Sequence, residues 1–238
     1  MQYSQNIAYS HFFPALRQVC RTTFARQAAN LMAVKARLWR MIVHSLELNS
    51  LLWRVDSVSI RVCRFARARD CRRFAGLAAF GYDETAEHTF FGFRAHLCVD
   101  EYGVIRAFTV APANAHDLAP VPELVEGYHG VVIGDRNYWS PRLAEDLASS
   151  GVMLCAPYKR IHQDPDPARS SLLGHLRRGI ETVIGHLVER YHLKTVRARD
   201  LWHFSSRLWR KILSYTLAVW LNLLYGRPPL HLEVLGAT

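Results

Sequence analysis

Three acidic residues lie in positions where acidic side chains are unusual, and together they could hold metal ions. Asp56 lies within LLWRVDSVSI, an alternating and largely apolar segment typical of a strand, where aspartate is uncommon. Asp135 follows a short apolar run at residues 130–133, and Glu181 lies at the margin of the apolar face of an amphipathic helix. Ligands of open α/β sheets lie beyond the carboxyl ends of strands, so the helix could bring Glu181 over both aspartates.

Converging carboxylates repel one another without a cation, and their oxygens are preferred ligands of Mg²⁺. Two Mg²⁺ or Mn²⁺ ions about 4 Å apart would activate the attacking oxygen and stabilise the leaving oxygen of an in-line displacement at phosphorus. Simpler explanations stay open for single acids. Asp135 could cap a turn or pair with Arg136, and Glu181 could pair with Arg177 or Arg178 on its own helix. The metal-site hypothesis therefore depends on the three acids together.

The periodicity of apolar residues predicts the elements that would position these acids. Strands are expected at residues 51–60, 89–99, 104–110, 130–133 and 152–156, with a hairpin turn at residues 100–103. Helices are expected at residues 15–48, 141–150, 172–191 and 201–225, a short helix or turn at 118–126, an Arg-rich connection at 61–79 and a polar loop at 163–171. Three antiparallel strands followed by parallel αβ units predict a mixed sheet of the RNase H-like α/β class, flanked by helices. We expect a helical N-terminal segment (1–50), a catalytic domain (51–200) and a C-terminal helix and tail (201–238).

The net charge of +10 is unevenly distributed along the 238 residues. Residues 81–150 carry −7, whereas residues 1–50, 51–80 and 151–238 carry +5, +5 and +7. An acidic centre between basic flanks suits an enzyme that binds phosphates at its edges and metal cations in its middle, although an uneven surface would give the same pattern. Residues 61–73 hold six arginines against Asp70, and this segment could contact DNA phosphates or form a solvated loop.

The cysteines and the hydropathy pattern favour a soluble cytoplasmic protein. The five cysteines are irregularly spaced without a CxxC pair, which indicates reduced thiols and neither disulfides nor a zinc site. The longest apolar stretch, at residues 212–225, is fourteen residues long and too short to span a membrane. No signal-peptide pattern is visible at residues 1–30, and we expect no membrane partner.

Four motifs follow one another between residues 50 and 225. They are VDSVSI around Asp56, FFGFRAHLCVDEYGVIRAFTVAPANAHD at 90–117, VVIGDRNYWSP at 131–141 and RRGIETVIGHL at 177–187. In this order they resemble the DDE-domain transposases of bacterial insertion sequences, most closely the insertion-sequence nine-eighty-two family. The resemblance implies a metal-binding triad of Asp56, Asp135 and Glu181, with Arg177 able to contact a phosphate beside the metals.

The sequence departs from the family pattern in two places. Related transposases have a tyrosine three residues before the arginine and a lysine seven residues after the glutamate, but Gly174 and Val188 stand there. Arg178 and Lys194 could substitute for them. Fifty-five residues precede Asp56, fewer than is usual in the family, so we expect residues 1–50 to be a truncated DNA-binding region.

The resemblance implies a transposase that cleaves DNA at the ends of its element and joins the freed 3′-OH to target DNA. Its partners would be the inverted-repeat ends and the target DNA, bound by a homodimer that associates with the nucleoid. The candidate DNA-binding residues are Arg61, Arg64, Arg67, Arg72, Arg73, Arg177 and Arg178. Two alternatives stay open: a metal-dependent nuclease that does not join strands, and an inactive or truncated remnant that only binds DNA.

Further side chains near these motifs have two interpretations each. His96 could support Asp56 or be a half-buried structural histidine, and Asp117, after His116, could order the rim of the site or cap a helix. Tyr138 and Trp139 could stack on an unpaired base or pack in the core.

Overall fold

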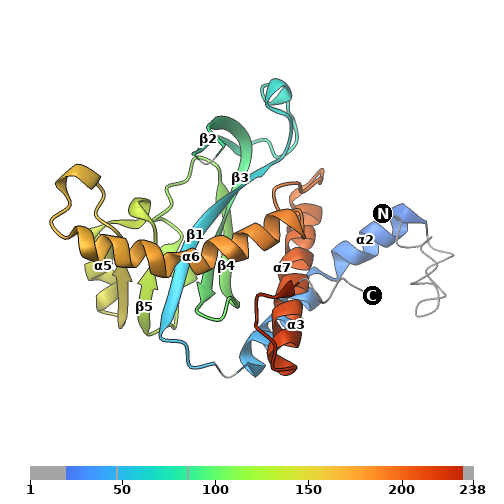
Figure 1. Cartoon of the computed structure of the whole chain (residues 1–238). Helices are drawn as coiled ribbons and strands as arrows, with labels where there is room; N and C mark the ends of the chain where they lie inside the picture. Colours follow the sequence, from blue (N-terminus) through green and yellow to red (C-terminus); the bar gives the residue numbers. More distant parts are fainter. Residues whose placement is uncertain (1–19, 47, 85, 233–238) are drawn as a thin grey trace.

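A mixed β-sheet forms the centre of the molecule, and a long helix crosses one of its faces (Figure 1). The computed structural model describes residues 20–46, 48–84 and 86–232. The strands are β1 (Leu52–Arg61), β2 (Ala79–Asp83), β3 (His88–Asp100), β4 (Ile105–Pro112), β5 (Gly130–Ile133) and β6 (Val152–Cys155). The helices are α2 (Arg21–Asn30), α3 (Met32–Ser45), α4 (Val121–Leu124), α5 (Pro141–Ala148), α6 (Pro167–Glu189) and α7 (Leu201–Leu224), with short 3₁₀ turns η3 (Phe65–Arg67), η4 (Arg136–Tyr138) and η5 (Ile161–Gln163).

The sheet order is β2-β3-β1-β5-β6, and β4 pairs with β3 as well. β1 is antiparallel to β3 and parallel to β5, and β5 is parallel to β6. The antiparallel part comes first along the chain and the parallel part second. The predicted mixed α/β fold is therefore confirmed, and its topology is compatible with an RNase H-like core.

The side chains of β1 point alternately to the two faces of the sheet, and each face is covered by its own layer of the hydrophobic core. Val58 and Ile60 belong to the cluster that includes side chains of α3, α6 and α7. Val55 belongs to the cluster that includes α4, α5 and the strands β5 and β6. Since side chains two residues apart share a face, Asp56 points to the α6 side of the sheet.

Two predictions about the elements were wrong. No strand was expected between the connection at 61–79 and the strand at 89–99, but Ala79–Asp83 form β2, which pairs with the first residues of β3. Pro167–Ser171 was expected to be a loop, but it is the first part of α6. Asp166 caps that helix by accepting the N–H of Arg169 at 2.9 Å, and Pro167 is well suited to the first turn.

The expected helical region at 15–48 consists of α2 and α3, which are separated at Leu31; residues 15–19 and 47 lie outside the described residues. Helix α7 packs Phe204, Ile212 and Tyr215 into the same core as the sheet. None of the helices in the described part of the chain has the length and apolar character needed to cross a lipid bilayer.

Candidate active site

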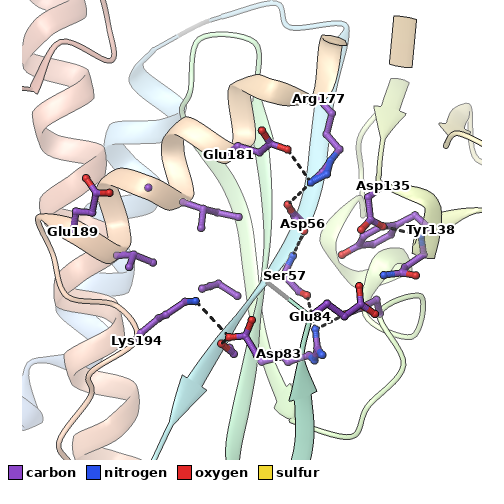
Figure 2. Close-up of a pocket in the computed structure, with 18 residues that line it drawn as sticks. Asp56, Ser57, Asp83, Glu84, Asp135, Tyr138, Arg177, Glu181, Glu189 and Lys194 are labelled. Atoms are coloured by element: carbon purple, nitrogen blue, oxygen red, sulfur yellow. Dashed lines mark hydrogen bonds and ion pairs between the residues drawn. The ribbon is translucent and has the colours of Figure 1, made fainter. Parts of the chain in front are cut away.

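The three predicted acids line a single cavity of about 440 Å³ between β1, the end of β5 and α6 (Figure 2). Asp56 comes from β1, Asp135 follows β5, and Glu181 projects from α6. The acidic residues that line the cavity are Asp56, Asp83, Glu84, Asp117, Asp135, Glu181 and Glu189, whereas the basic residues are Arg94, Arg177 and Lys194. The structure thus brings the proposed triad together in an acidic cavity.

Arg177 links two members of the triad. Its Nη2 lies 3.2 Å from Asp56 Oδ2 and 3.1 Å from Glu181 Oε1, as the dashed lines in Figure 2 show. Arg177 and Glu181 are one helical turn apart on α6, so they share a face of the helix. About 18% of the Arg177 side chain and 17% of the Asp56 side chain are exposed, so this ion pair is largely shielded from water.

Arg54 holds α6 in place over β1. Its Nε donates to the Leu176 carbonyl oxygen at 2.5 Å, and its Nη1 donates to the Asp100 carbonyl oxygen at 3.0 Å. Gly179 allows this close approach, because a Cβ at that position would lie 3.1 Å from the Arg54 guanidinium carbon. Arg54 lies two residues before Asp56 and therefore on the same face of the strand. The contact that docks α6 thus also sets Arg177 and Glu181 above Asp56.

Burial dominates the electrostatics of the two aspartates. Burial raises the pKa of Asp56 to about 6, although Arg177 and the backbone N–H of Ser57 oppose the rise. Burial also raises the pKa of Asp135, opposed mainly by the N–H of Asn137. Partly buried carboxylates with raised pKa values favour protonation or a bound cation.

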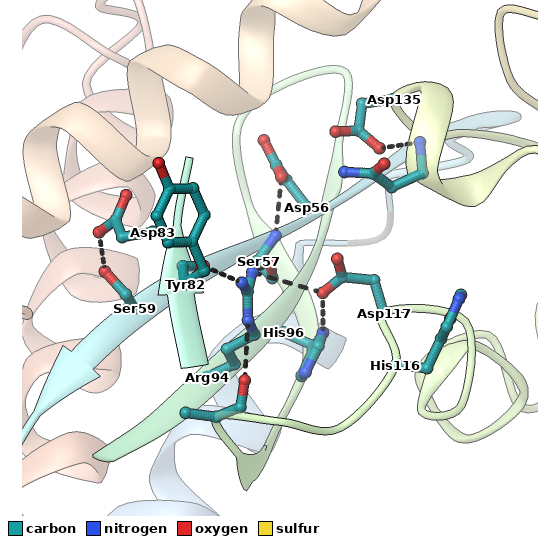
Figure 3. A network of polar contacts seen from close by, with 12 residues as sticks. Asp56, Ser57, Ser59, Tyr82, Asp83, Arg94, His96, His116, Asp117 and Asp135 are labelled. Carbon is teal, nitrogen blue, oxygen red and sulfur yellow. Dashed lines mark hydrogen bonds and ion pairs between the residues drawn. The ribbon is translucent and has the colours of Figure 1, made fainter. Parts of the chain in front are cut away.

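A second polar network supports the cavity from the neighbouring strand β3 (Figure 3). Arg94 Nη1 donates to Ser57 Oγ at 3.2 Å and lies 3.7 Å from Asp117 Oδ1. His96 is fully buried rather than half-buried, and its Nδ1 lies 3.8 Å from the same oxygen of Asp117. Burial lowers the pKa of His96, which favours the neutral ring. This network orients Asp117 toward the acidic cavity.

Sequence reasoning offered Asp117 only as a residue that orders the rim of the site or caps a helix, and did not include it in the metal-binding set. The neighbouring His116 is exposed and accepts the N–H of Leu118 at 3.2 Å, which is the capping role expected for this pair. Asp117 instead lines the acidic cavity. Its position at the end of the motif at 90–117 was the signal available in the sequence.

The simpler explanations for single acids also hold locally. Asp135 caps the short η4 turn by accepting the N–H of Asn137 at 2.8 Å, while Arg136 donates to the Tyr158 carbonyl oxygen instead of pairing with Asp135. Glu181 pairs with Arg177 and not with Arg178. The local contacts coexist with the cavity, so they do not decide between a structural and a catalytic role.

The two aromatic residues after Asp135 pack within the protein. Tyr138 is 1% exposed, and Trp139 lies edge-on to Tyr158 with ring centroids 4.9 Å apart. Burial raises the pKa of Tyr138 well above its usual value. These contacts favour packing over base stacking.

The candidate DNA-binding arginines divide into three groups. Arg61, Arg64 and Arg73 line a cavity of about 530 Å³ that we call the arginine cavity. Arg177 lies in the acidic cavity. The remaining three, Arg67, Arg72 and Arg178, are exposed and line neither cavity.

The donor set of the acidic cavity suits a hard divalent cation, because its acidic residues offer only oxygen ligands. Two of these carboxylates are partly buried and have raised pKa values, a condition that a nearby cation relieves. As the side chains stand, no group of three or more His, Cys, Asp or Glu residues in the described ranges is close enough to hold a metal ion. Arg177 supplies positive charge to Asp56 and Glu181 in this arrangement.

The family model for the transposase DDE domain matches residues 49–201, well over half of the chain. The chain belongs to the transposase DDE domain family. The match begins three residues before β1, contains all six strands and α6, and ends at the first residue of α7. The expectation of a DDE-type transposase is thereby confirmed, and the family implies DNA as the partner. No curated protein matched this transposase chain.

Proposed function

We propose that this transposase catalyses divalent-metal-dependent cleavage of DNA and strand transfer at the ends of an insertion sequence of the nine-eighty-two type. The observation that carries the proposal is the cavity in which α6 sets Glu181 and Arg177 over Asp56, opposite Asp135. An acidic cavity in a transposase domain is suited to concentrate cations where a phosphodiester must react.

In this proposal Asp56, Asp135 and Glu181 are the residues that would hold the metals. When bound, two Mg²⁺ or Mn²⁺ ions would supply the charge that activates the attacking oxygen and stabilises the leaving oxygen. Water attacks phosphorus first, which breaks the bond between phosphorus and the 3′ oxygen and leaves a 3′-OH and a 5′-phosphate. The 3′-OH then gives up its proton and attacks a phosphorus of the target DNA, which displaces a 3′ oxygen of the target strand as a new 3′-OH. Positioning and charge neutralisation supply most of the rate in such transfers.

Arg177 has a second role in the proposal. Without DNA it neutralises Asp56 and Glu181 at 3.2 and 3.1 Å. Guanidinium groups bind phosphate oxygens well, so Arg177 can exchange its carboxylate partners for the scissile phosphate as DNA enters. The exposed side of Glu181, whose side chain is 55% exposed, leaves room for that exchange.

We further propose that the protein acts as a homodimer, since two element ends must be cut together, and that six further arginines contact DNA phosphates. Three of them, Arg61, Arg64 and Arg73, line the arginine cavity. The other three, Arg67, Arg72 and Arg178, are exposed to solvent. The division into residues 1–50, 51–200 and 201–238 stays a prediction.

The decisive test is Asp135→Asn. Asparagine retains the oxygen that caps η4 but lacks the charge needed for a metal, so cleavage of element-end DNA should be abolished while DNA binding and thermal stability persist. Asp146→Asn, an exposed position on α5, is the matched control and should cleave normally. An Asp135→Asn variant that cleaves near the wild-type rate would contradict the catalytic assignment.

A second assay with pre-cut ends separates a transposase from a nuclease that shares the same triad. Wild-type protein should join the free 3′-OH of a pre-cut end to target DNA in Mg²⁺, and Asp135→Asn should not. Cleavage without joining would favour the nuclease, and binding without cleavage or joining would favour a remnant that only binds DNA.

A further inference from the structure

A strongly basic cavity of about 300 Å³ lies between α2 and α7, away from the acidic cavity. We call it the α2–α7 cavity. Six Lys or Arg residues line it, and the described lining contains no Asp or Glu. These basic residues are Arg21, Lys35, Arg197, Arg207, Arg210 and Lys211.

The two lysines are held by uncharged partners. Lys35 Nζ donates to Ser206 Oγ at 2.6 Å and to the Ala28 carbonyl oxygen. Lys211 Nζ donates to the His192 carbonyl oxygen at 2.9 Å and to that of Tyr191. These bonds fix the positions of the ammonium groups, but they do not neutralise their charge.

Arginines of the cavity also have no acid at ion-pair distance among the described residues. Within the described residues, Arg197, Arg207 and Arg210 form no ion pair. Asp200, an acid near the cavity, attracts Arg207 and lies with its Oδ2 2.8 Å from Nδ1 of His203.

The cations are close enough to repel one another. Burial, followed by repulsion from Arg210 and Arg207, lowers the pKa of Lys211 to about 8. Burial and repulsion from Arg210 also lower the pKa of Lys35. A cavity that gathers uncompensated cations is stabilised by a bound anion, and a polyanion relieves several repulsions together.

The segment between α6 and α7 connects this cavity with the site of cleavage. Lys194 lines both the acidic cavity and the arginine cavity, and Arg197 lines both the arginine cavity and the α2–α7 cavity. Thr195 forms a β-bridge to Arg61 at the end of β1, which fixes the segment to the central sheet. Neighbouring cavities in this series therefore share lining residues within the segment 194–197.

We propose that the α2–α7 cavity binds the sugar-phosphate backbone of the DNA strand that extends from the acidic cavity along residues 194–197. The proposal rests on the proposed function, because it takes the acidic cavity as the place where DNA is cut. The lining of the three cavities changes from acidic at the proposed cleavage site to basic along residues 194–197, and basic residues are what a DNA phosphate backbone binds. Seven acids line the acidic cavity, whereas the other two are lined by cations without acids among the described residues.

The test compares two double variants that remove the same charge. Arg207→Ala/Arg210→Ala alters the cavity, and Arg142→Ala/Arg169→Ala alters exposed positions on α5 and α6 that line none of the three cavities. Binding of duplex DNA is measured by fluorescence anisotropy in EDTA over a range of salt concentrations. The slope of log K against log salt should flatten by roughly 0.9 for each phosphate that is no longer neutralised, about 1.8 for the cavity variant. The control should keep the wild-type slope.

A third double variant, Arg207→Lys/Arg210→Lys, retains the charge and should retain most of the slope, which separates a role of charge from one of packing. Melting temperature verifies that each protein is folded, and removal of two repelling cations should leave it unchanged or raised. Inorganic phosphate is the second probe, at constant ionic strength. Binding of phosphate to the wild type with an unchanged DNA slope in the cavity variant would mean a small-anion site and would overturn the proposal.

Because binding is measured without metal, the outcome does not depend on catalysis. A flattened slope with no cleavage by the wild-type protein would contradict the proposed function and support the cavity as a DNA site. Cleavage by the wild-type protein with the same slope in all variants would contradict the cavity alone.

Discussion

Substitution of Asp56 by asparagine should change how the stability of the metal-free protein depends on pH. Burial raises the pKa of Asp56 from 3.8 to about 6, despite the nearby Arg177. The folded protein therefore binds this proton more tightly than the unfolded chain does. The contribution of this group to the free energy of unfolding is fully present below the pKa of the unfolded chain and is lost as pH rises through the pKa of the folded protein. Each pKa unit corresponds to about 1.4 kcal/mol, so the wild-type protein should lose about 3 kcal/mol from this group over that range.

Asparagine is neutral throughout this range, and its side-chain oxygen can still accept the N–H of Ser57, which lies 2.8 Å from Asp56 Oδ1. The free energy of unfolding of Asp56→Asn minus that of the wild type should therefore increase by about 2 to 3 kcal/mol between about pH 4 and pH 7.5. At the higher pH, Arg177 still has Glu181 as a partner at 3.1 Å, which limits the cost of breaking the ion pair.

The assay is urea unfolding in EDTA at a series of pH values, with Asp146→Asn on the exposed face of α5 as control. Added Mg²⁺ should restore stability to the wild type at pH 7.5 and should do so less in Asp56→Asn, because ligand binding stabilises only the form that binds it. A free-energy difference between variant and wild type that stays constant with pH would refute the reasoning. A variant less stable than the wild type at pH 7.5 would do the same.

Three further substitutions test other parts of the structure. Gly179→Ala should destabilise the protein in urea unfolding, because its Cβ would lie 3.1 Å from the guanidinium of Arg54. Gly174→Ala is the control on the same helix; its Cβ would have nothing within 4 Å and should stabilise the protein by up to about 1 kcal/mol. Equal effects of the two substitutions would refute the docking role of Arg54. Tyr138→Phe removes a buried hydroxyl that has no hydrogen-bond partner in the described residues, so melting temperature should stay constant or rise and cleavage should persist; loss of cleavage would assign the hydroxyl a role in the reaction. The arginine cavity is tested by replacing Arg61, Arg64 and Arg73 with alanine. The slope of log K against log salt for DNA binding should flatten by roughly 0.9 for each phosphate that these arginines neutralise. An unchanged slope would mean that they form a solvated surface.

The parts of the fold that were predictable are those whose burial follows a simple period. In β1 and β3 one set of alternating side chains enters each core layer, so the sequence carries the pattern directly. β2 was missed because its outward residues Phe80 and Tyr82 are apolar but 45% and 50% exposed, and its other residues are uncommon in strands. The start of α6 was missed because a segment with two prolines favoured a loop, although Asp166 before Pro167 is a helix-capping signal.

The site was predictable to the extent that its residues are unusual in their local sequence. Asp56 is an acid within an apolar strand, and the pairing of Arg177 with Glu181 follows from their spacing on one helix. The contact between Arg177 and Asp56 joins residues 121 positions apart and depends on where α6 crosses β1. That crossing is fixed by Arg54 and its two carbonyl partners, a long-range contact that no local pattern contains.

The placement of Arg54 and Asp56 on one face of β1 restricts how this strand can change in evolution. Since side chains alternate between faces, an insertion or deletion of a single residue before Arg54 that shifted the pairing of β1 would turn both residues to the opposite side of the sheet. A single insertion or deletion of this kind would remove both the contact of Arg54 with α6 and the carboxylate of Asp56 from that face. No single later substitution would restore both. Length changes are therefore excluded from this strand, whereas the exposed residues around Arg67 can accommodate them, so lineages of this domain should differ in length around η3 and keep β1 constant.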